Sequence, residues 1–370
     1  MGPAEIERHL ADALRDLLSR ASWLSGWTVK LAPRKKSLPS WDLIASGPLP
    51  NGQNAILCVE CKRHFQPSQF SGLADRQCSE NDCDHVCRVL AMPYVSPRMA
   101  ALCQQHGWGW FDLAGNCRLE IPGALLIERV GQEPVRQVQR PAANLSGPEA
   151  GRIVRALLAP ENAGKRWTQR AMVAHFDALT PTVPSPSLAL VNKVVQHLRD
   201  QAFLEPLPNR GFQVRDHLGL LEVWRRAYRF DRVQRRRYFT LLQGRALNDA
   251  LRTLDASTHG RVAYSAFSAA DIQAPHVRQA RTWLYVAPDV EEQFLTKVEA
   301  KPVDSGENLI VFIPDDDGVF YHLDISNTRL ACTNAVQTYI DLSHAGGRGE
   351  EAAEAVLRQK LQPAWSRGKE

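Results

Sequence analysis

Residues 55–62 read Ala-Ile-Leu-Cys-Val-Glu-Cys-Lys, and this stretch decides how the first third of the chain is predicted to fold. Five apolar residues in a row, followed by charged ones, predict a buried strand that ends near Glu60. Because side chains alternate along a strand, Glu60 and Lys62 are expected on one side of the sheet and Cys61 on the other. The strand would therefore present a carboxylate beside an ammonium group.

A second carboxylate, Asp42, lies near the start of another short apolar stretch at residues 41–45, and a proline-rich turn at 48–52 separates the two. A hairpin of this kind would bring Asp42 to the same end of the sheet as Glu60 and Lys62. Two carboxylates suit a hard cation such as Mg²⁺, and a nearby lysine can orient or deprotonate a water that attacks a phosphodiester. The predicted catalytic residues are therefore Asp42, Glu60 and Lys62, with Asp42 and Glu60 as the Mg²⁺ ligands.

This arrangement resembles the PD-(D/E)XK nuclease superfamily, the core found in many restriction enzymes. A predicted helix at residues 6–18, with Glu5 and Glu7 at its start, fits the helix that leads into that core. Trp41 stands where the superfamily often has proline, so the match is partial, and any surface strand can carry a Glu-x-Lys ion pair. The resemblance implies a restriction-endonuclease-like mixed sheet covered by helices. It implies either metal-dependent DNA cleavage or a nuclease-like fold used for binding alone.

The composition suits a multidomain protein. The chain has 370 residues, of which 44% are hydrophobic, so two or three packed domains are expected. No run of eighteen apolar residues occurs, which predicts that nothing spans a membrane. The N-terminal segment is predicted to be an amphipathic helix instead of a signal peptide with an apolar core. A cytoplasmic protein of bacterial type is expected.

Five of the eight cysteines fall within residues 58–87. Reduced thiols are expected in preference to disulfides in a chain of this kind. Cys58 and Cys61 should face opposite sides of their strand, which is poor geometry for sharing a metal ion. Free, buried cysteines are the favoured prediction. The alternative is a zinc site on one face of a helix, formed by Cys78, Cys83, Cys87 and His85.

Residues 147–217 predict three short helices followed by a hairpin, which is the order of a winged helix. Thr168 is the expected N-cap of the second helix, and apolar residues recur at helical spacing in the third, at 187–201. This third helix would enter the major groove of DNA, and the hairpin turn at Asn209-Arg210 would touch phosphate or the minor groove. A module used only for protein contacts is the alternative. The predicted DNA-contacting residues here are Ser185, Ser187, Asn192, Lys193, Gln196 and Arg210.

Seven arginines crowd into residues 225–237, although the net charge of the whole chain is only +5. Such a density suits phosphate contacts, because Asp231 is the only acid inside the run. A helix at 218–230 is predicted to carry the arginines, and a solvated helix face paired with acids is the alternative. The arginines predicted to contact DNA are Arg225, Arg226, Arg229, Arg235, Arg236 and Arg237.

Two C-terminal stretches resemble a bacterial family. Residues 334–342, NAVQTYIDL, and 347–354, GRGEEAAE, are similar to the C-terminal signature of AbiEi-type antitoxins of abortive-infection (type IV) toxin–antitoxin systems. Residues 220–224, LLEVW, fit the same architecture, and residues 110–119 resemble the end of a nuclease-like domain fused to a winged helix. The resemblance implies a transcriptional regulator whose winged helix binds promoter DNA. The N-terminal nuclease-like domain is the departure from simple antitoxins.

The sequence therefore predicts three domains of α/β and α+β type. They are a nuclease-like domain at 1–135, a winged helix at 147–217 and an AbiEi-like α+β domain at 218–370, with a polar linker at 136–147. The favoured function is a DNA-binding regulator of a toxin–antitoxin or defence-type locus, and the alternative is a Mg²⁺-dependent endonuclease. A third reading is an antitoxin that acts through contact with a nucleotidyltransferase-like toxin. Double-stranded DNA and a cognate toxin are the expected partners, a homodimer is left open, and no membrane is expected.

Overall fold

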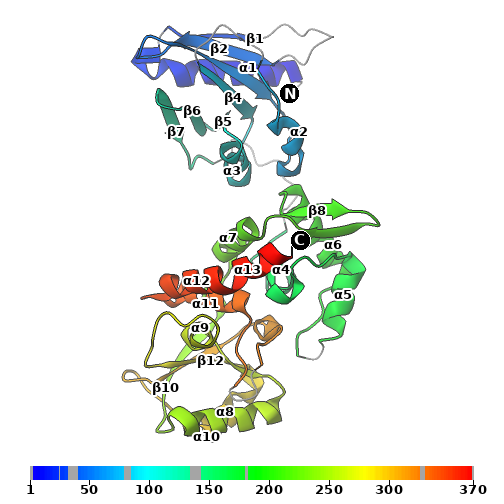
Figure 1. Ribbon diagram of the computed structural model, residues 1–370, viewed down its shortest axis with the longest axis vertical. Helices are drawn as coiled ribbons and strands as arrows, with labels where there is room; N and C mark the ends of the chain where they lie inside the picture. The colour runs from blue at the N-terminus through cyan, green and yellow to red at the C-terminus, as the bar shows by residue number, and fades with distance from the viewer. Residues whose placement is uncertain are drawn as a thin grey trace. The chain divides into compact units, whose positions relative to one another are not determined.

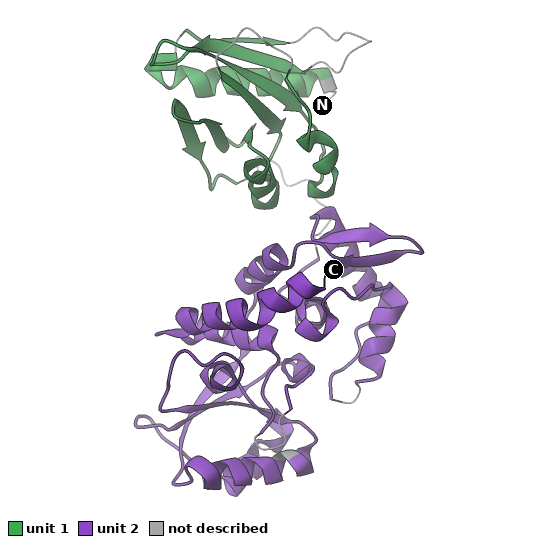
Figure 2. Ribbon diagram, in the orientation of Figure 1, with its two compact units in different colours: residues 1–141 green, residues 142–370 purple. Residues whose placement is uncertain are grey.

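The computed structural model describes residues 3–24, 26–31, 41–78, 85–133, 143–179, 182–325 and 330–368. They form two compact units, Met1–Pro141 and Ala142–Glu370 (Figure 2). Each unit combines helices with at least one sheet, which confirms the mixed α/β class. Cys83 and most of the predicted linker (136–142) lie outside the described residues. In the ranges given above, no helix is both long and apolar enough to cross a bilayer.

The first unit is built on a sheet whose seven described strands follow one another in sequence order (Figure 1). The central strands β3, β4 and β5 run parallel, and the outer pairs are antiparallel. The predicted strand over residues 55–59 is confirmed. The strands are β1 (Thr28–Leu31), β2 (Leu43–Pro48), β3 (Asn54–Cys61), β4 (His85–Met92), β5 (Trp108–Asp112), β6 (Cys117–Ile121) and β7 (Leu125–Arg129).

Helices cover both faces of this sheet, and the alternation of side chains along β3 decides what each face contains. Leu57 and Val59 belong to the cluster under α1 (Pro3–Ser19). Ile56 and Cys58 belong to the opposite cluster, which includes residues of α2 (Ser71–Ala74) and α3 (Pro97–Gln105). Glu60 continues the alternation on the side of Cys58. The strand therefore sends the carboxylate toward the α2 and α3 side.

The second unit begins with three helices and a hairpin, as predicted. They are α4 (Pro148–Leu158), α5 (Gln169–Asp177), α6 (Leu188–Asp200), β8 (Leu204–Leu207) and β9 (Gly211–Val214). Thr168 is the N-cap of α5, since its Oγ1 accepts a hydrogen bond from the Ala171 amide at 3.1 Å. Trp167 and Phe212 exchange two backbone hydrogen bonds of 2.8 Å each. This exchange adds one more bridge to the edge of the hairpin.

After α7 (His217–Ala227), the second unit forms a five-stranded sheet in the order β11-β12-β14-β10-β13. Helices α9 and α11 lie on one side of it, and α8 and α10 lie on the other (Figure 1). The strands are β10 (Gln234–Phe239), β11 (Val262–Tyr264), β12 (Thr282–Val286), β13 (Lys301–Pro302) and β14 (Leu309–Ile313). The helices are α8 (Gly244–Thr258), α9 (Ala266–Gln273), α10 (Glu291–Lys297), α11 (Ala335–Ala345), α12 (Gly349–Val356) and α13 (Gln362–Arg367).

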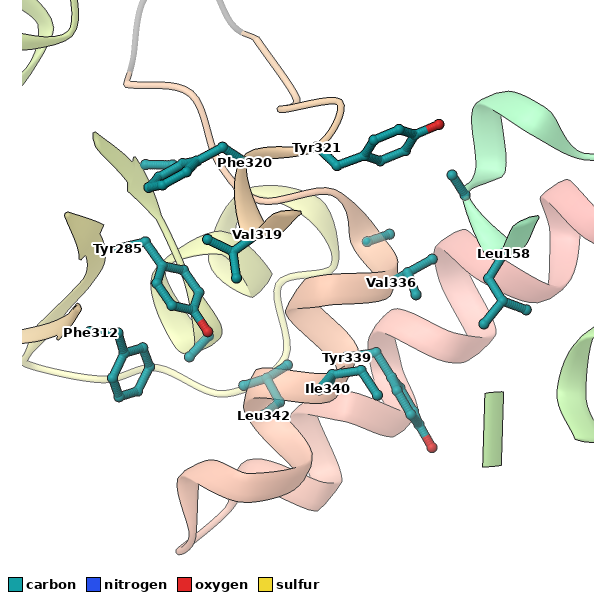
Figure 3. Packing of buried hydrophobic residues seen from close by; sticks show 14 of the residues in the cluster. Leu158, Tyr285, Phe312, Val319, Phe320, Tyr321, Val336, Tyr339, Ile340 and Leu342 are labelled. Atoms are coloured by element: carbon teal, nitrogen blue, oxygen red, sulfur yellow. The ribbon is translucent and has the colours of Figure 1, made fainter. Parts of the chain in front are cut away.

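A single hydrophobic core runs through the second unit. It contains Leu158 of α4, Phe312 of the sheet and Ile340 of α11 (Figure 3). At its end, the indole Nε1 of Trp365 donates to the Leu158 carbonyl at 2.9 Å. The segments predicted as a winged helix and as an AbiEi-like domain therefore share one core.

Candidate functional site

Asp42, Glu60 and Lys62 converge at one end of β2 and β3. Asp42 directly precedes β2, and its amide donates to the Val59 carbonyl at 3.0 Å, so it lies opposite Glu60. The Oδ2 atom of Asp42 accepts a hydrogen bond from the Cys61 amide at 2.8 Å. The Nζ atom of Lys62 lies 2.5 Å from the Oε1 atom of Glu60. The structure thus brings the three predicted residues together.

A fourth residue, Arg76, closes this cluster. Its guanidinium pairs with the Oε2 atom of Glu60, whose whole residue is only 5% exposed. The same guanidinium lies over the Trp41 ring, 4.3 Å from the ring centre. Lys62 and Arg76 therefore engage both oxygens of the Glu60 carboxylate. Arg76 lies sixteen residues beyond Glu60 and outside any regular element, so no local spacing in the sequence could predict its contact with Glu60.

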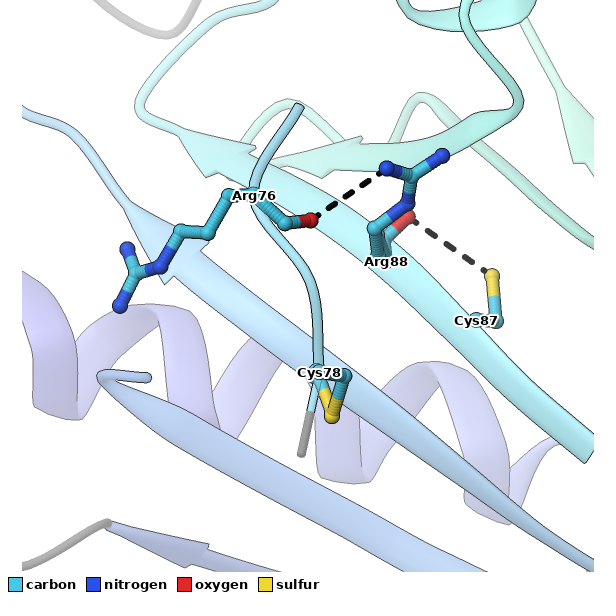
Figure 4. The surroundings of a disulfide bond; sticks show 5 residues. Arg76, Cys78, Cys87 and Arg88 are labelled. Carbon is cyan, nitrogen blue, oxygen red and sulfur yellow. Dashed lines mark hydrogen bonds between the residues drawn. A yellow bond between two sulfur atoms is a disulfide. The ribbon is translucent and has the colours of Figure 1, made fainter. Parts of the chain in front are cut away.

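The segment that carries Arg76 is held from two sides (Figure 4). The Nη1 atom of Arg88, on β4, donates to the carbonyls of Ala74 at 3.0 Å and Arg76 at 3.3 Å. A disulfide joins Cys78, two residues after Arg76, to Cys58 on β3. These links fix the backbone on both sides of Arg76, so its side chain is positioned to reach Glu60.

The cysteines correct two predictions. Cys58 and Cys78 form a disulfide, so the prediction that they are free thiols is wrong. Cys87 lies on β4, so it cannot share a helix face with Cys78, and the alternative of a zinc site on one helix face is wrong. The physical reason is that β4 begins at His85, where the zinc alternative required a helix. The free cysteines of the described ranges are Cys61, Cys87, Cys103, Cys117 and Cys332.

The cluster as arranged does not fit a Mg²⁺ ion. Three of the four carboxylate oxygens already accept hydrogen bonds, from Cys61, Lys62 and Arg76. Two cations already neutralise Glu60, whereas Mg²⁺ needs free oxygen ligands. Burial raises the pKa of Asp42, and the nearby Glu60 carboxylate adds to this rise, while the Cys61 amide opposes it. Across the residues that the structure describes, no group of three or more His, Cys, Asp or Glu side chains could hold a metal ion.

Helix α6 presents the predicted polar face to solvent. Asn192, Lys193 and Gln196 are exposed, while the apolar residues Val191, Val194, Val195 and Leu198 are buried. The Oδ1 atom of Asn192 accepts from the side-chain amide of Gln169 at 2.9 Å, and Gln196 donates to Asp200 at 2.9 Å. The Gln169 contact fixes the orientation of the Asn192 side-chain amide. Hydrogen bonds within the protein therefore already order part of the polar face of α6.

The other predicted residues of this segment differ in role. Ser187 is the N-cap of α6, with its Oγ accepting from the Leu190 amide at 3.2 Å. Ser185 donates to the Val173 carbonyl at 3.4 Å and is half-buried. Arg210 is exposed in the hairpin turn, where its φ of +59° lies in the left-handed region. Both serines therefore already serve the local structure, and Arg210 remains exposed at the tip of the hairpin.

The arginine run does not form one helical surface. Helix α7 ends at Ala227, so only Arg225 and Arg226 of the run lie on it, and the prediction of a helix through residue 230 is wrong. Arg225 pairs with Glu222 at 3.0 Å and with Glu350 at 3.6 Å, whereas Arg226 is exposed. The three-dimensional fold thus supplies acids that are distant in the sequence.

The rest of the run continues into a turn and a strand. Arg229 pairs with Asp231 at 2.6 Å. On β10, Arg235 lies over the Trp283 ring at 4.9 Å from its centre, Arg236 pairs with Glu291, and Arg237 donates to the Asp304 carbonyl at 3.3 Å. A strand alternates its side chains, so Arg236 points away from Arg235 and Arg237. DNA contact by these arginines stays a prediction.

A buried polar network that the sequence did not predict joins α4 to α11. The Nε and Nη2 atoms of Arg155 donate to the Oε1 atom of Gln337 at 2.9 and 2.7 Å. Gln337 and the Tyr285 hydroxyl each donate to the Oδ1 atom of Asp341 at 2.7 Å. Burial raises the pKa of Asp341 to about 7. The sequence offered one signal for this network, the i, i+4 spacing of Gln337 and Asp341. That spacing places both residues on one face of a helix.

Comparison with known proteins agrees with the C-terminal resemblance. Residues 213–362 match the family described as "Transcriptional regulator, AbiEi antitoxin, Type IV TA system". The matched range runs from β9 to the start of α13 and includes the Gln337–Asp341 pair. No curated protein and no solved structure matches the chain. The family match therefore supports a relationship between this part of the chain and AbiEi-type antitoxins of type IV toxin–antitoxin systems.

Proposed function

We propose that this protein is a DNA-binding transcriptional regulator of a type IV toxin–antitoxin locus, with a cognate toxin as its protein partner. The observation that carries the proposal is the exposed polar face of α6, in a chain whose residues 213–362 match that family of regulators. The face combines two side-chain amides with one lysine. Amides can read base edges in the major groove, and a lysine can contact phosphate.

The segment that contains α6 is proposed to be a winged helix. Its order of three helices and a hairpin supports this, and so do the two hydrogen bonds that pair Trp167 with Phe212 as a further bridge of the hairpin. Arg199 also favours a fixed wing, because its Nη2 atom donates to the Gly211 carbonyl at 2.8 Å. Arg199 is therefore proposed to hold the hairpin, not to contact DNA.

Within this reading, each predicted residue has a distinct role. Asn192 and Gln196 would contact base edges, while Lys193 and Arg210 would contact phosphates. Ser187 would place the first turn of α6, and Ser185 would anchor the preceding loop on α5. The exposed arginines of residues 225–237 would add attraction that does not depend on sequence.

A salt titration of DNA binding tests this proposal. Fluorescence anisotropy would follow binding of the full chain to a duplex from its own promoter region as salt increases. Lys193→Gln and Arg210→Gln should each reduce the slope of log K against log salt by about 1, as the loss of one phosphate contact requires. The matched control is Arg358→Gln, because Arg358 is exposed and pairs with Glu354 on the C-terminal helices. Equal slopes in all four proteins would contradict the assignment.

A second candidate function, metal-dependent DNA cleavage, is favoured by the convergence of Asp42, Glu60 and Lys62. We infer a PD-(D/E)XK-like core in the first unit from its leading helix, its antiparallel β1–β3 and its parallel β3–β4 pair. For this function Arg76 would have to leave Glu60, because the ion needs those oxygens. Incubation of plasmid with Mg²⁺ or Mn²⁺ tests it, with Asp42→Asn as the control. Cleavage that the variant lacks would establish the nuclease, and uncut plasmid with both metals would leave the regulator alone.

A further inference from the structure

A cavity of about 690 Å³ opens in the second unit, at the end of the sheet where β11 ends and β12 begins. It is bounded by the first turns of α8, by α9 and by the segment 278–282. None of the residues proposed to contact DNA lines it. Its volume lies in the range of sites that hold small-molecule ligands, which is roughly 300–1,000 Å³.

The lining of this cavity carries an excess of positive charge. Three arginines, Arg245, Arg278 and Arg281, face one aspartate, Asp271. Arg281 pairs with Glu307 at 3.1 Å, outside the lining. The side chain of Arg245 is 95% exposed and pairs with Asp249 at 3.7 Å, so its charge is weakly neutralised.

Further guanidinium groups strengthen the positive potential at this end of the sheet. Arg235 lies over the ring of Trp283, which is the neighbour of lining residue Thr282. Burial lowers the pKa of Arg235, the nearby charges of Arg237 and Arg281 lower it further, and the Glu307 carboxylate opposes this lowering. These three guanidinium groups therefore lie near one another beside the cavity, with Glu307 among them.

The cavity also has an apolar and aromatic wall. Phe267 is buried and packs against Trp283, with ring centres 5.3 Å apart, and Tyr264 and Ile272 line the same space. Arginines alone would suit the backbone of a duplex, which lies across exposed side chains on a surface. A concave site that combines cations with aromatic and aliphatic walls suits a small molecule with a charged end and a flat end.

We propose that this cavity binds a small phosphorylated molecule that carries a planar ring, which is the chemistry of a nucleotide. Arg278 and Arg245 contact the phosphates, and guanidinium groups are well matched to phosphate oxygens. The ring lies against the wall formed by Tyr264 and Ile272, and Asp271 accepts hydrogen bonds from hydroxyl or amino groups of the ligand. The site is independent of the DNA-binding proposal, since different residues form it.

Isothermal titration of the full chain in the absence of DNA tests this assignment. The probes are ATP, GTP, AMP and pyrophosphate, and the variants are Arg278→Gln and Arg245→Gln. Each variant should weaken nucleotide binding about ten-fold or more, because a charged hydrogen bond is lost. Arg358→Gln is again the matched control, because Arg358 does not line the cavity. Arg278 and Arg245 are both exposed, so thermal melting should show that the two variants remain folded.

The expected result is saturable binding of one nucleotide per chain, tighter than about 1 mM, that both cavity variants weaken and the control does not. Absence of binding by all four probes would overturn the proposal. Binding that the cavity variants leave unchanged would also overturn it, because the ligand would then lie elsewhere. If pyrophosphate binds as tightly as the nucleotides, the ring-binding part of the proposal is wrong.

Discussion

Replacement of Arg155 by methionine should destabilise the second unit strongly. Arg155 is 3% exposed, and its two hydrogen bonds of 2.9 and 2.7 Å both end on the Oε1 atom of Gln337, which is fully buried. The guanidinium also lies over the Trp224 ring, 5.2 Å from its centre. Methionine keeps much of the apolar volume but supplies no donor. The substitution therefore isolates the polar link between α4 and α11.

The size of the effect follows from the groups left behind. A hydrogen bond from a charged donor contributes about 1.5–3 kcal/mol, and a buried acceptor left without a donor costs about 1–3 kcal/mol. We expect a loss of this size in the free energy of unfolding of the second unit.

Hydrogen exchange followed by mass spectrometry measures this loss locally, because peptides from α4 and α11 report the opening of those helices. The control is Arg252→Met, an exposed arginine on α8, which should change the opening free energy by less than about 0.5 kcal/mol. If Arg155→Met changes α4 and α11 no more than the control does, the buried network does not hold these helices together.

Three further predictions concern other contacts. Because burial raises the pKa of Asp341 to about 7, the folded protein keeps a proton that the unfolded chain has lost between about pH 4 and 7. Wild-type stability should therefore fall as pH rises through this window, by up to about 1.4 kcal/mol per unit, and Asp341→Asn should lack that slope in urea titrations. Arg76→Ala should free one oxygen of Glu60, so Mn²⁺ binding measured by calorimetry should be tighter than in the wild type; equal affinity would refute the blocking role. Thr168→Ala should cost about 1 kcal/mol in thermal unfolding, because the N-cap of α5 is lost, and no change would count against the cap.

Local patterns predicted the parts of the fold that depend on local rules. The apolar run before Glu60 gave β3, and its alternation correctly placed Cys58 and Cys61 on opposite faces. The N-cap at Thr168 and the hairpin turn at Asn209 could be predicted equally well, because caps and turns depend on residues close in sequence. The convergence of Asp42 and Glu60 followed from the register of a single hairpin, formed by β2 and β3.

Long-range pairing could not be predicted in the same way. Arg76 reaches Glu60 from the irregular stretch that follows α2, and Cys78 reaches Cys58 from the same stretch. After β14, residues Asp317–Phe320 form a 3₁₀ helix. Asp316, directly before it, pairs with Arg152 of α4, which lies 164 residues away in the chain. Such partners depend on packing that no single window of sequence contains.

The acids that neutralise part of the arginine run illustrate the same limit. Glu350 and Glu291 lie far along the chain from Arg225 and Arg236, yet the fold brings them into contact. The number of arginines in residues 225–237 therefore predicted more unpaired positive charge than the folded protein presents.

The central claim is that α6 reads DNA, and the ratio of specific to non-specific affinity tests it most directly. The dissociation constants of wild type and Asn192→Ala would be measured on the promoter duplex and on a shuffled duplex of equal length. If Asn192 contacts a base edge, the variant should lose about 1–3 kcal/mol on the promoter and little on the shuffled duplex. Equal loss on both duplexes, or no loss on either, would show that α6 does not read the sequence.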